Sequence, residues 1–341
     1  MTAPLRFGVI GAGRIGRVHA ENLAYRVPGA ELAAIADPQL DVAAACAAQL
    51  RVARATADYR ELLADPTIKA LVIASPTDQH ARMIQECAEA GKEIFCEKPI
   101  DLDLKRVDEA LEAVARAGVR LQVGFNRRFD PGFAKAKEQI ASGAIGKPHL
   151  IKVTGRDPKP ASLEYLAVSG GIFTDMTIHD FDAVRWLMGD EVVEIFAMGA
   201  VLIDPAIGSL GDVDTALTSL RYAGGALGNI DNSRQARYGY DVRVEVFGSE
   251  GSVAVGNLTP TTVTLSSSAG VRGDTPLHWF IERFEQAYLL EMRDFVACLR
   301  DDRAPSVTGA DGRVPLVMAR AAKLSAAERR PVRLDEVEAR V

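Results

Sequence analysis

The chain has 341 residues, of which 48% are hydrophobic and 25% are charged, as in an ordinary globular protein. This length exceeds what one hydrophobic core usually supports, so two domains are expected. The net charge of −6 and the lack of a basic tail argue against binding to a nucleic-acid backbone.

Cysteine and histidine usage limits the compartment and the kind of site. Cys46, Cys87, Cys96 and Cys298 occur without CxxC spacing, which predicts free thiols in a reducing compartment. The five histidines are dispersed, so local spacing predicts no Cys/His metal site. The N-terminal residues lack the layout of a signal peptide, and no apolar run is long enough to span a bilayer. We therefore expect a metal-free cytoplasmic protein that binds no membrane.

Residues 1–124 alternate between apolar β-compatible runs and helical segments. The alternation predicts a doubly wound parallel sheet. The expected strands lie within residues 5–13, 30–37, 69–75, 93–99 and 119–129, and the expected helices within 14–25, 40–50, 58–68, 78–92 and 103–118.

Residues 125–341 follow a different pattern, in which glycine-rich turns separate consecutive strand-like runs. They predict an α/β domain with a large, mostly antiparallel, open-faced sheet. Because such a sheet needs both faces covered, we expect helices on one face and subunit association on the other. The C-terminal helical segment is expected to pack back on the first domain. The expected strands are 149–157, 192–202, 214–222, 225–235, 240–256 and 261–268, and the helices are 132–146, 279–301 and 309–326.

A G-x-G-x-x-G motif follows the first expected strand and opens a helix. In this context Gly11 permits a tight turn, Gly13 admits a pyrophosphate, and Gly16 lets helix and strand pack closely. The helix N-terminus at Arg14 and Ile15 would then attract the anion. The alternative is a glycine turn that binds nothing.

An acidic residue about 20 positions further favours a dinucleotide site. Asp37 ends the second strand, where a carboxylate accepts hydrogen bonds from an adenosine ribose. It would also repel a 2′-phosphate, and neither Pro38 nor Gln39 supplies a positive charge. The expected cofactor is therefore NAD and not NADP.

Two further strand ends should lie along the same edge of the sheet, where ligands bind. Ser75 follows the third strand, and His80 begins the next helix as either a second functional histidine or a structural residue near the cofactor. Glu97 and Lys98 end the fourth strand, before Pro99. Lys98 is either a surface lysine or the group that stabilises charge on a reacting oxygen.

The stretch 170–182, "GGIFTDMTIHDFD", contains three aspartates and one histidine. On one helix, Asp175 and His179 would lie on the same face, and Asp182 would continue that stripe. The alternative is a solvated helix face without catalytic function. Asp180 and Asp182 are expected to be bystanders. The expected core residues of this region are Phe173, Met176, Val184 and Leu187.

These motifs, in this order and at these spacings, resemble those of the Gfo/Idh/MocA family of nucleotide-dependent oxidoreductases. The resemblance extends over nearly the whole chain. Within the family, the stretches 122–130, 170–182 and 237–248 are most similar to those of inositol dehydrogenases. The resemblance implies an N-terminal Rossmann domain, a C-terminal α/β domain whose open sheet forms a subunit interface, and a homotetramer.

The same resemblance implies a catalytic set of Lys98, Asp175 and His179, none of which is replaced. It also implies that the substrate is a polyol, oxidised as myo-inositol is oxidised to its 2-keto form. The alternatives are a dehydrogenase for another cyclitol or sugar, such as scyllo-inositol, D-chiro-inositol or glucose, and a non-catalytic protein that senses the dinucleotide. The implied polyol contacts besides the catalytic set are Asn126, Arg127, Asp157 and Tyr238.

The chemistry gives each member of the catalytic set a task. His179 can accept the hydroxyl proton because histidine titrates near neutrality. Lys98 would hold the reacting oxygen, and the cofactor would take the hydride. Asp175 would either orient the imidazole or bind a substrate hydroxyl, and the sequence leaves that choice open.

Overall fold

The computed structural model describes residues 3–339 and divides the chain into two compact units. The first unit comprises Met1–Phe129 and Gln286–Val314, and the second comprises Asp130–Glu285 and Pro315–Val341. The first unit thus includes a segment from far beyond residue 124. None of the described helices is both long and apolar enough to cross a lipid bilayer.

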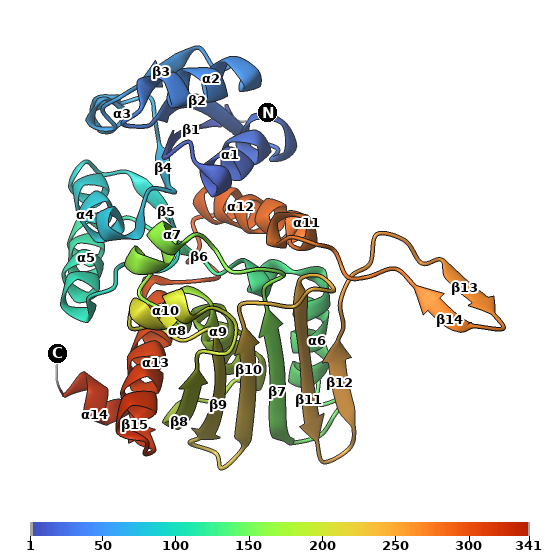
Figure 1. Ribbon diagram of the computed structural model, residues 1–341. Coiled ribbons are helices and arrows are strands. Elements are labelled where there is room, and N and C mark those ends of the chain that lie inside the picture. Colours follow the sequence, from blue (N-terminus) through green and yellow to red (C-terminus); the bar gives the residue numbers. More distant parts are fainter. Residues whose placement is uncertain (1–2, 340–341) are drawn as a thin grey trace. The chain divides into compact units, whose positions relative to one another are not determined.

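A six-stranded parallel sheet forms the first unit, in the order β3-β2-β1-β4-β5-β6 (Figure 1). The direction of strand addition reverses between β1 and β4, which creates the crevice where such sheets bind ligands. The predicted doubly wound sheet is therefore confirmed, with a short additional strand, β3. The strands are β1 (Leu5–Ile10), β2 (Ala30–Ala36), β3 (Arg54–Thr56), β4 (Ala70–Ile73), β5 (Glu93–Glu97) and β6 (Leu121–Gly124).

The helices of this unit begin and end where local chemistry favours it. Asp103 caps α5 by accepting hydrogen bonds from two backbone N–H groups, and Gly118 ends the helix in the left-handed conformation. Helices α4 and α5 lie side by side (Figure 1). The helices are α1 (Arg14–Glu21), η1 (Asn22–Arg26), α2 (Leu40–Leu50), α3 (Arg60–Ala64), η2 (Thr77–Gln79), α4 (His80–Glu89), α5 (Leu104–Ala117), η3 (Asn126–Phe129) and α12 (Glu285–Arg300).

Helix α12 completes the core of the first unit, although it lies about 160 residues beyond the last strand. Its Met292 and Phe295 are fully buried in one cluster with Phe7 of β1 and Phe95 of β5. The rings of Phe7 and Phe295 meet edge to face, with centroids 6.1 Å apart. This burial anchors helix α12 to the parallel sheet.

A seven-stranded sheet forms the second unit, in the order β12-β11-β7-β10-β9-β8-β15. Only β7 and β10 pair in parallel, and the other neighbours are antiparallel, as predicted. The strands are β7 (Pro148–Arg156), β8 (Val192–Ala200), β9 (Thr215–Tyr222), β10 (Leu227–Ser233), β11 (Asp241–Gly248), β12 (Ser252–Val255) and β15 (Val332–Arg333).

Helices cover one face of this sheet. Helices α6 and α9 contact each other and the strands β12, β7 and β10 (Figure 1). Along β9, buried residues alternate with exposed ones, so the opposite face carries exposed residues such as Leu217. The helices are α6 (Pro131–Ala141), α7 (Leu163–Val168), α8 (Ile172–Asp175), α9 (Thr177–Met188), α10 (Pro205–Ser209), α11 (Phe280–Arg283), α13 (Gly309–Glu328), which begins in the first unit, and α14 (Leu334–Glu338).

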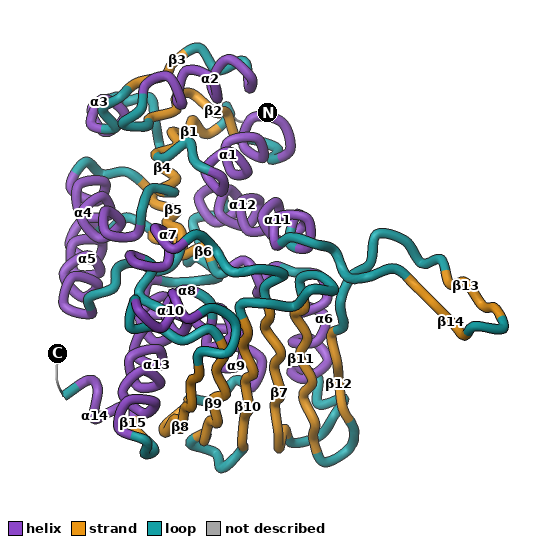
Figure 2. Tube along the Cα trace, in the orientation of Figure 1, coloured by secondary structure: helices purple, strands orange, loops and turns teal. Residues whose placement is uncertain are grey.

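A separate two-stranded hairpin, β13 (Thr264–Ser267) and β14 (Gly270–Gly273), extends away from the seven-stranded sheet (Figures 1 and 2). Every residue of both strands is exposed, including Leu265 and Val271. Isolated two-stranded hairpins are only marginally stable in water.

Candidate active site

The glycine loop lies between β1 and α1, and its three glycines meet different surroundings. Gly11 has φ +97°, and an added Cβ would lie 2.5 Å from the carbonyl oxygen of Ala74. A Cβ on Gly16 would lie 1.9 Å from the carbonyl oxygen of Gly11. In contrast, a Cβ on Gly13 would meet nothing within 4 Å. The fold therefore requires Gly11 and Gly16, whereas the absence of a side chain at Gly13 leaves the loop open to a ligand.

Helix α1 directs its N-terminus out of this loop. Gly13 is its N-cap residue, and Arg14 and Ile15 form the start of its first turn. The first N–H groups of a helix have no partner within the helix, and the helix dipole adds partial positive charge there. This arrangement fits a pyrophosphate above Gly13.

Asp37 directly follows β2 and is held against the glycine loop. One carboxylate oxygen accepts a hydrogen bond from the backbone N–H of Ala12 at 2.9 Å, and the other accepts one from Gln39 at 3.0 Å. The carboxylate is thus fixed at the sheet edge where the ribose-binding acid was expected.

His80 connects two loops at the same edge of the sheet. Its Nδ1 lies 2.8 Å from the carbonyl oxygen of Pro99, and its Nε2 lies 2.8 Å from that of Ser75. The ring is almost completely buried, with 1% exposed. These contacts give His80 a positioning role between the loop after β4 and the loop that begins at Lys98.

Glu97 and Lys98 differ in their surroundings although they are consecutive. The Glu97 carboxylate is turned inward, where it lies 2.7 Å from Nε2 of the buried His19. Lys98 is half-buried, and it is the one residue of 92–100 that is not buried. The next strand, β6, leads directly into Asn126 and Arg127 of η3, which are 2% and 3% exposed.

In the second unit a single helix was expected over 170–182. The structure has two helices there, because the helix is interrupted at Met176. Asp175 is the last residue of α8, and His179 lies in the first turn of α9. Within residues 172–184 these two side chains alone are partly exposed, and all the others are buried. The pair is therefore accessible at a surface that is otherwise closed. The four residues predicted as core of this region, Phe173, Met176, Val184 and Leu187, are all buried.

The alternative of a solvated polar helix face does not hold for the two later aspartates. Asp180 and Asp182 are 0% and 1% exposed. Asp180 accepts a hydrogen bond from the Asn232 amide at 2.8 Å, and Thr177 donates to the same amide at 2.7 Å. These polar groups face the sheet, because Asn232 lies in β10. Both aspartates are therefore buried and do not belong to a solvated helix face.

Asp175 is held by two donors that the sequence did not reveal. The hydroxyl of Tyr165 donates to one carboxylate oxygen at 2.7 Å, and the guanidinium of Arg234 donates to the other at 3.2 Å. Arg234 also pairs with Asp212 at 3.3 Å and is 1% exposed. Burial of its hydroxyl end and the charge of Asp175 raise the pKa of Tyr165, with a further contribution from Asp157, so its hydroxyl remains a donor.

The other predicted polyol contacts of this unit lie just after β7 and in the connection between β10 and β11. Asp157 follows β7, and its charge acts on Tyr165. Tyr238 belongs to a neighbouring polar group, in which its hydroxyl donates to Asp241 at 2.6 Å and accepts from Arg156 at 3.2 Å. The structure thus associates Asp157, Asp175 and His179 within one unit, while Lys98, Asn126 and Arg127 belong to the other.

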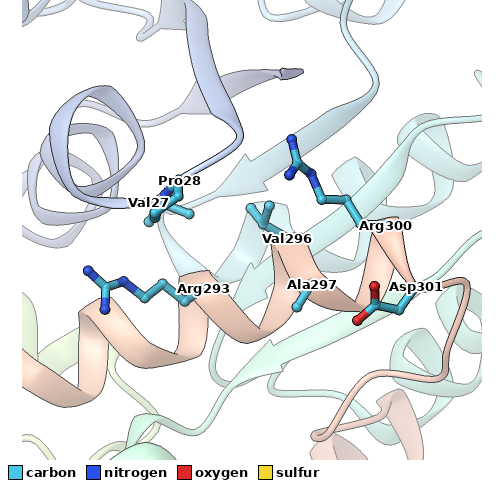
Figure 3. Close-up of a pocket in the computed structure, with 7 residues that line it drawn as sticks. All are labelled: Val27, Pro28, Arg293, Val296, Ala297, Arg300 and Asp301. Carbon is cyan, nitrogen blue, oxygen red and sulfur yellow. The ribbon is translucent and has the colours of Figure 1, made fainter. Parts of the chain in front are cut away.

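A hollow of about 350 Å³ in the first unit lies between the loop before β2 and helix α12 (Figure 3). Arg293 and Arg300 flank it and donate hydrogen bonds to the backbone carbonyls of Arg26 and Gly29. None of the candidate site residues lines it. The two arginines attach the loop to the helix.

The described residues also contain one set of three side chains of metal-ligating type, His19, Glu97 and Glu291, with one ligand atom each within 4.8 Å of the others. His19 and Glu97 are directly hydrogen-bonded at 2.7 Å. Two ligands of one zinc ion lie roughly 3 Å or more apart. These two atoms therefore do not share an ion in this arrangement.

Two family models match the chain. The model of the oxidoreductase family with an NAD-binding Rossmann fold matches residues 5–125, and the GFO/IDH/MocA C-terminal domain matches residues 133–254. The chain belongs to the GFO/IDH/MocA oxidoreductase family. The nucleotide for which the Rossmann model is named, NAD, is the cofactor expected from Asp37.

Relatives with assigned activities match over nearly their whole length. Myo-inositol 2-dehydrogenase of Thermotoga maritima is 49% identical, covering 98% of this chain and 99% of the relative. The NAD(+)-dependent scyllo-inositol 2-dehydrogenase of Bacillus subtilis is 42% identical, with 98% of each chain covered.

Solved structures agree with the fold. A probable dehydrogenase from Thermotoga maritima gives a TM-score of 0.96 at 49% identity, over 98% of this chain and all of that chain. Myo-inositol dehydrogenase from Lactobacillus casei, in complex with NAD(H) and myo-inositol, gives a TM-score of 0.86 at 28% identity. The match covers 97% of this chain and 96% of that chain.

Substitutions in the glycine loop separate the needs of folding from those of binding. Gly13→Ala should leave the melting temperature nearly unchanged, because its Cβ meets open space, but weaken NAD binding about tenfold or more by blocking the pyrophosphate. Gly16→Ala should lower the melting temperature clearly, because its Cβ would overlap the backbone of Gly11. Thermal melts and NAD titrations test both variants. An unchanged NAD affinity in Gly13→Ala would contradict a dinucleotide at this loop.

Proposed function

We propose that this protein is an NAD-dependent dehydrogenase that oxidises myo-inositol to its 2-keto derivative. The observation that carries the proposal is the exposure of Asp175 and His179 alone within a buried segment, in a chain 49% identical to a myo-inositol 2-dehydrogenase. The oxidation of a secondary alcohol requires a proton acceptor, and His179 is accessible there together with a carboxylate. Inositol catabolism is the corresponding cellular role.

In this proposal the two units divide the work. The first unit binds NAD through the glycine loop and Asp37, with Ser75, His80 and Glu97 supporting the same sheet edge. NAD, when bound, supplies the hydride acceptor. The second unit contributes polyol contacts and His179, the proton acceptor. Lys98 holds the reacting oxygen and stabilises the negative charge that develops on it.

Asp175 acts as an anion in this scheme. Its carboxylate is already held by the hydroxyl of Tyr165 and the guanidinium of Arg234. A fixed negative charge four residues before His179 stabilises the imidazolium that forms when the proton is taken. The same carboxylate has the acceptor capacity to bind a substrate hydroxyl. The remaining polyol contacts in the proposal are Asn126, Arg127, Asp157 and Tyr238.

A second candidate substrate is scyllo-inositol. The relative that oxidises it is 42% identical over nearly the whole chain, so the shared architecture accommodates either cyclitol. The two isomers differ only in the orientation of one hydroxyl, and hydrogen bonds in the site decide such preferences.

The proposal includes a homo-oligomer, and the family resemblance implies that it is a tetramer. The open face of the second unit exposes Met198 and Leu217, which are paired across β8 and β9, together with Leu227 and Phe247. The hairpin β13–β14 exposes two further apolar side chains, Leu265 and Val271. Association would cover both features. The four cysteines are unpaired, which agrees with the reducing cytoplasm as the site of action.

The substrate assignment is tested with a panel of cyclitols and sugars. The purified protein is mixed with NAD or NADP and with myo-inositol, scyllo-inositol, D-chiro-inositol or glucose, and reduced cofactor is followed by absorbance. Myo-inositol with NAD should give the highest kcat/KM, because Asp37 repels the 2′-phosphate of NADP. A higher kcat/KM for scyllo-inositol would select the second candidate. NAD binding without any turnover would support the alternative of a non-catalytic protein that senses the dinucleotide.

Replacement of the proposed base tests the mechanism. His179→Ala should lower kcat by about 10²–10⁴, because the hydroxyl proton loses its acceptor. The matched control is His149→Ala, an exposed histidine of β7 at which no acid–base role is proposed. The control should stay within about twofold of the wild-type rate. A near-wild-type kcat for His179→Ala would remove this residue from the mechanism.

The open sheet face is tested by placing a charge on it. Leu217→Glu, 45% exposed in β9, should shift the protein from an oligomer towards the 36.6 kDa monomer, because a buried charge at an interface is costly. Leu40→Glu, 51% exposed in the first unit, is the control and should keep the wild-type mass. Light scattering after gel filtration measures both. A monomeric wild type would refute the proposed association.

A further inference from the structure

A buried cluster behind the candidate lysine contains two carboxylic acids and one imidazole. His19 comes from α1, Glu97 ends β5, and Glu291 comes from α12. His19 and Glu291 are completely buried, and Glu97 is 8% exposed. All three belong to the first unit, and Glu97 directly precedes Lys98 in the chain.

Within the described part of the chain, this cluster has too few hydrogen-bond donors. His19 Nε2 and Glu97 Oε1 share one hydrogen bond at 2.7 Å. Both carboxylate oxygens of Glu291 and Nδ1 of His19 are buried without a partner. Gln122 of β6 donates only to the backbone carbonyl of Glu291, at 3.0 Å. An ionised carboxylate in such surroundings loses its hydration without compensation, whereas a protonated one supplies a donor.

The groups that face Glu291 favour a single negative charge in the cluster. Glu97 approaches from β5 and is negative, and His19 of α1 is engaged with Glu97. The ring of Tyr288, from α12 itself, packs edge to face on His19. Burial, together with the charge of Glu97, raises the pKa of Glu291 well above its usual value.

We propose that Glu291 is a positioning residue that stays a neutral carboxylic acid, so that Glu97 carries the only negative charge behind Lys98. This role rests on the proposed function, because it concerns the residue proposed to hold the reacting oxygen. The Glu97 carboxylate sits over Gly124, where an added Cβ would lie 3.2 Å from its atoms. A second negative charge at Glu291 would repel Glu97 from this place and shift the chain that carries Lys98.

The first test needs no substrate and uses melting temperatures to determine whether Glu291 is protonated in the folded protein. Because the folded protein holds this proton more tightly than the unfolded chain, rising pH removes stability from the wild type until the folded group itself titrates. Glu291→Gln has the same shape and does not titrate. From pH 5 upward, and until Glu291 titrates in the folded protein, the melting temperature of this variant should rise relative to that of the wild type by roughly 2–4 °C per pH unit. A pH-independent difference would overturn the proposal, as would a stoichiometric divalent metal in elemental analysis of the purified protein.

The second test separates positioning from simple packing. Glu291→Ala should lower kcat at least tenfold, and Glu291→Gln should restore it to within about threefold of the wild type, because the amide reproduces the neutral acid. Glu97→Gln, which removes the charge assigned to Glu97, should lower kcat at least tenfold. Equal losses in Glu291→Gln and Glu97→Gln would contradict the assignment of the charge to Glu97. If the wild type oxidises no polyol, the proposed function fails, while the melting comparison still decides the state of Glu291.

Discussion

Arg234 is completely buried in the second unit, where its guanidinium lies between the carboxylates of Asp175 and Asp212. Removing one partner of such a buried ion pair costs several kcal/mol, because the other charge remains in the interior. Asp212 also accepts the backbone N–H of Ile172 at 2.9 Å, so this pair fixes the first residue of α8 as well as its last. The short helix that presents Asp175 therefore depends on Arg234.

The same arrangement explains the second of the two glycines that open this stretch. Gly171 has φ +86°, and an added Cβ would lie 2.8 Å from a carboxylate oxygen of Asp212. A side chain there would be strained and would also displace the carboxylate from Arg234. Glycine at this position and an aspartate 41 residues later are thus parts of one structure that holds Asp175. The polar residues of α9 have a separate task, since Asp180 and Thr177 anchor that helix to Asn232 of β10.

Local patterns in the sequence were sufficient to predict those features that depend on local interactions. The parallel sheet, the glycine loop and Asp37 follow from hydrophobic runs and from spacings of a few to about 20 residues. Arg234 could not be found in this way, because its contact with Asp175 spans 59 positions and buried arginines are rare. Helix α12 was recognisable by its period, but an apolar face does not say which core it will join. The break at Met176 separates Asp175 from His179 into two helices that spacing alone had merged.

Both units meet one requirement, that a carboxylate leaving water must be paired or neutralised. In the second unit Arg234 supplies the pairing for Asp175, which lies at an accessible surface. In the first unit Glu291 has no cation beside it among the described residues, and neutralisation by a proton is the remaining solution. Successive residues of a strand point to opposite faces, so Glu97 at the end of β5 reaches the interior while the chain continues directly into Lys98. A charge change in the interior cluster is therefore transmitted over a single peptide bond to the residue proposed to hold the reacting oxygen.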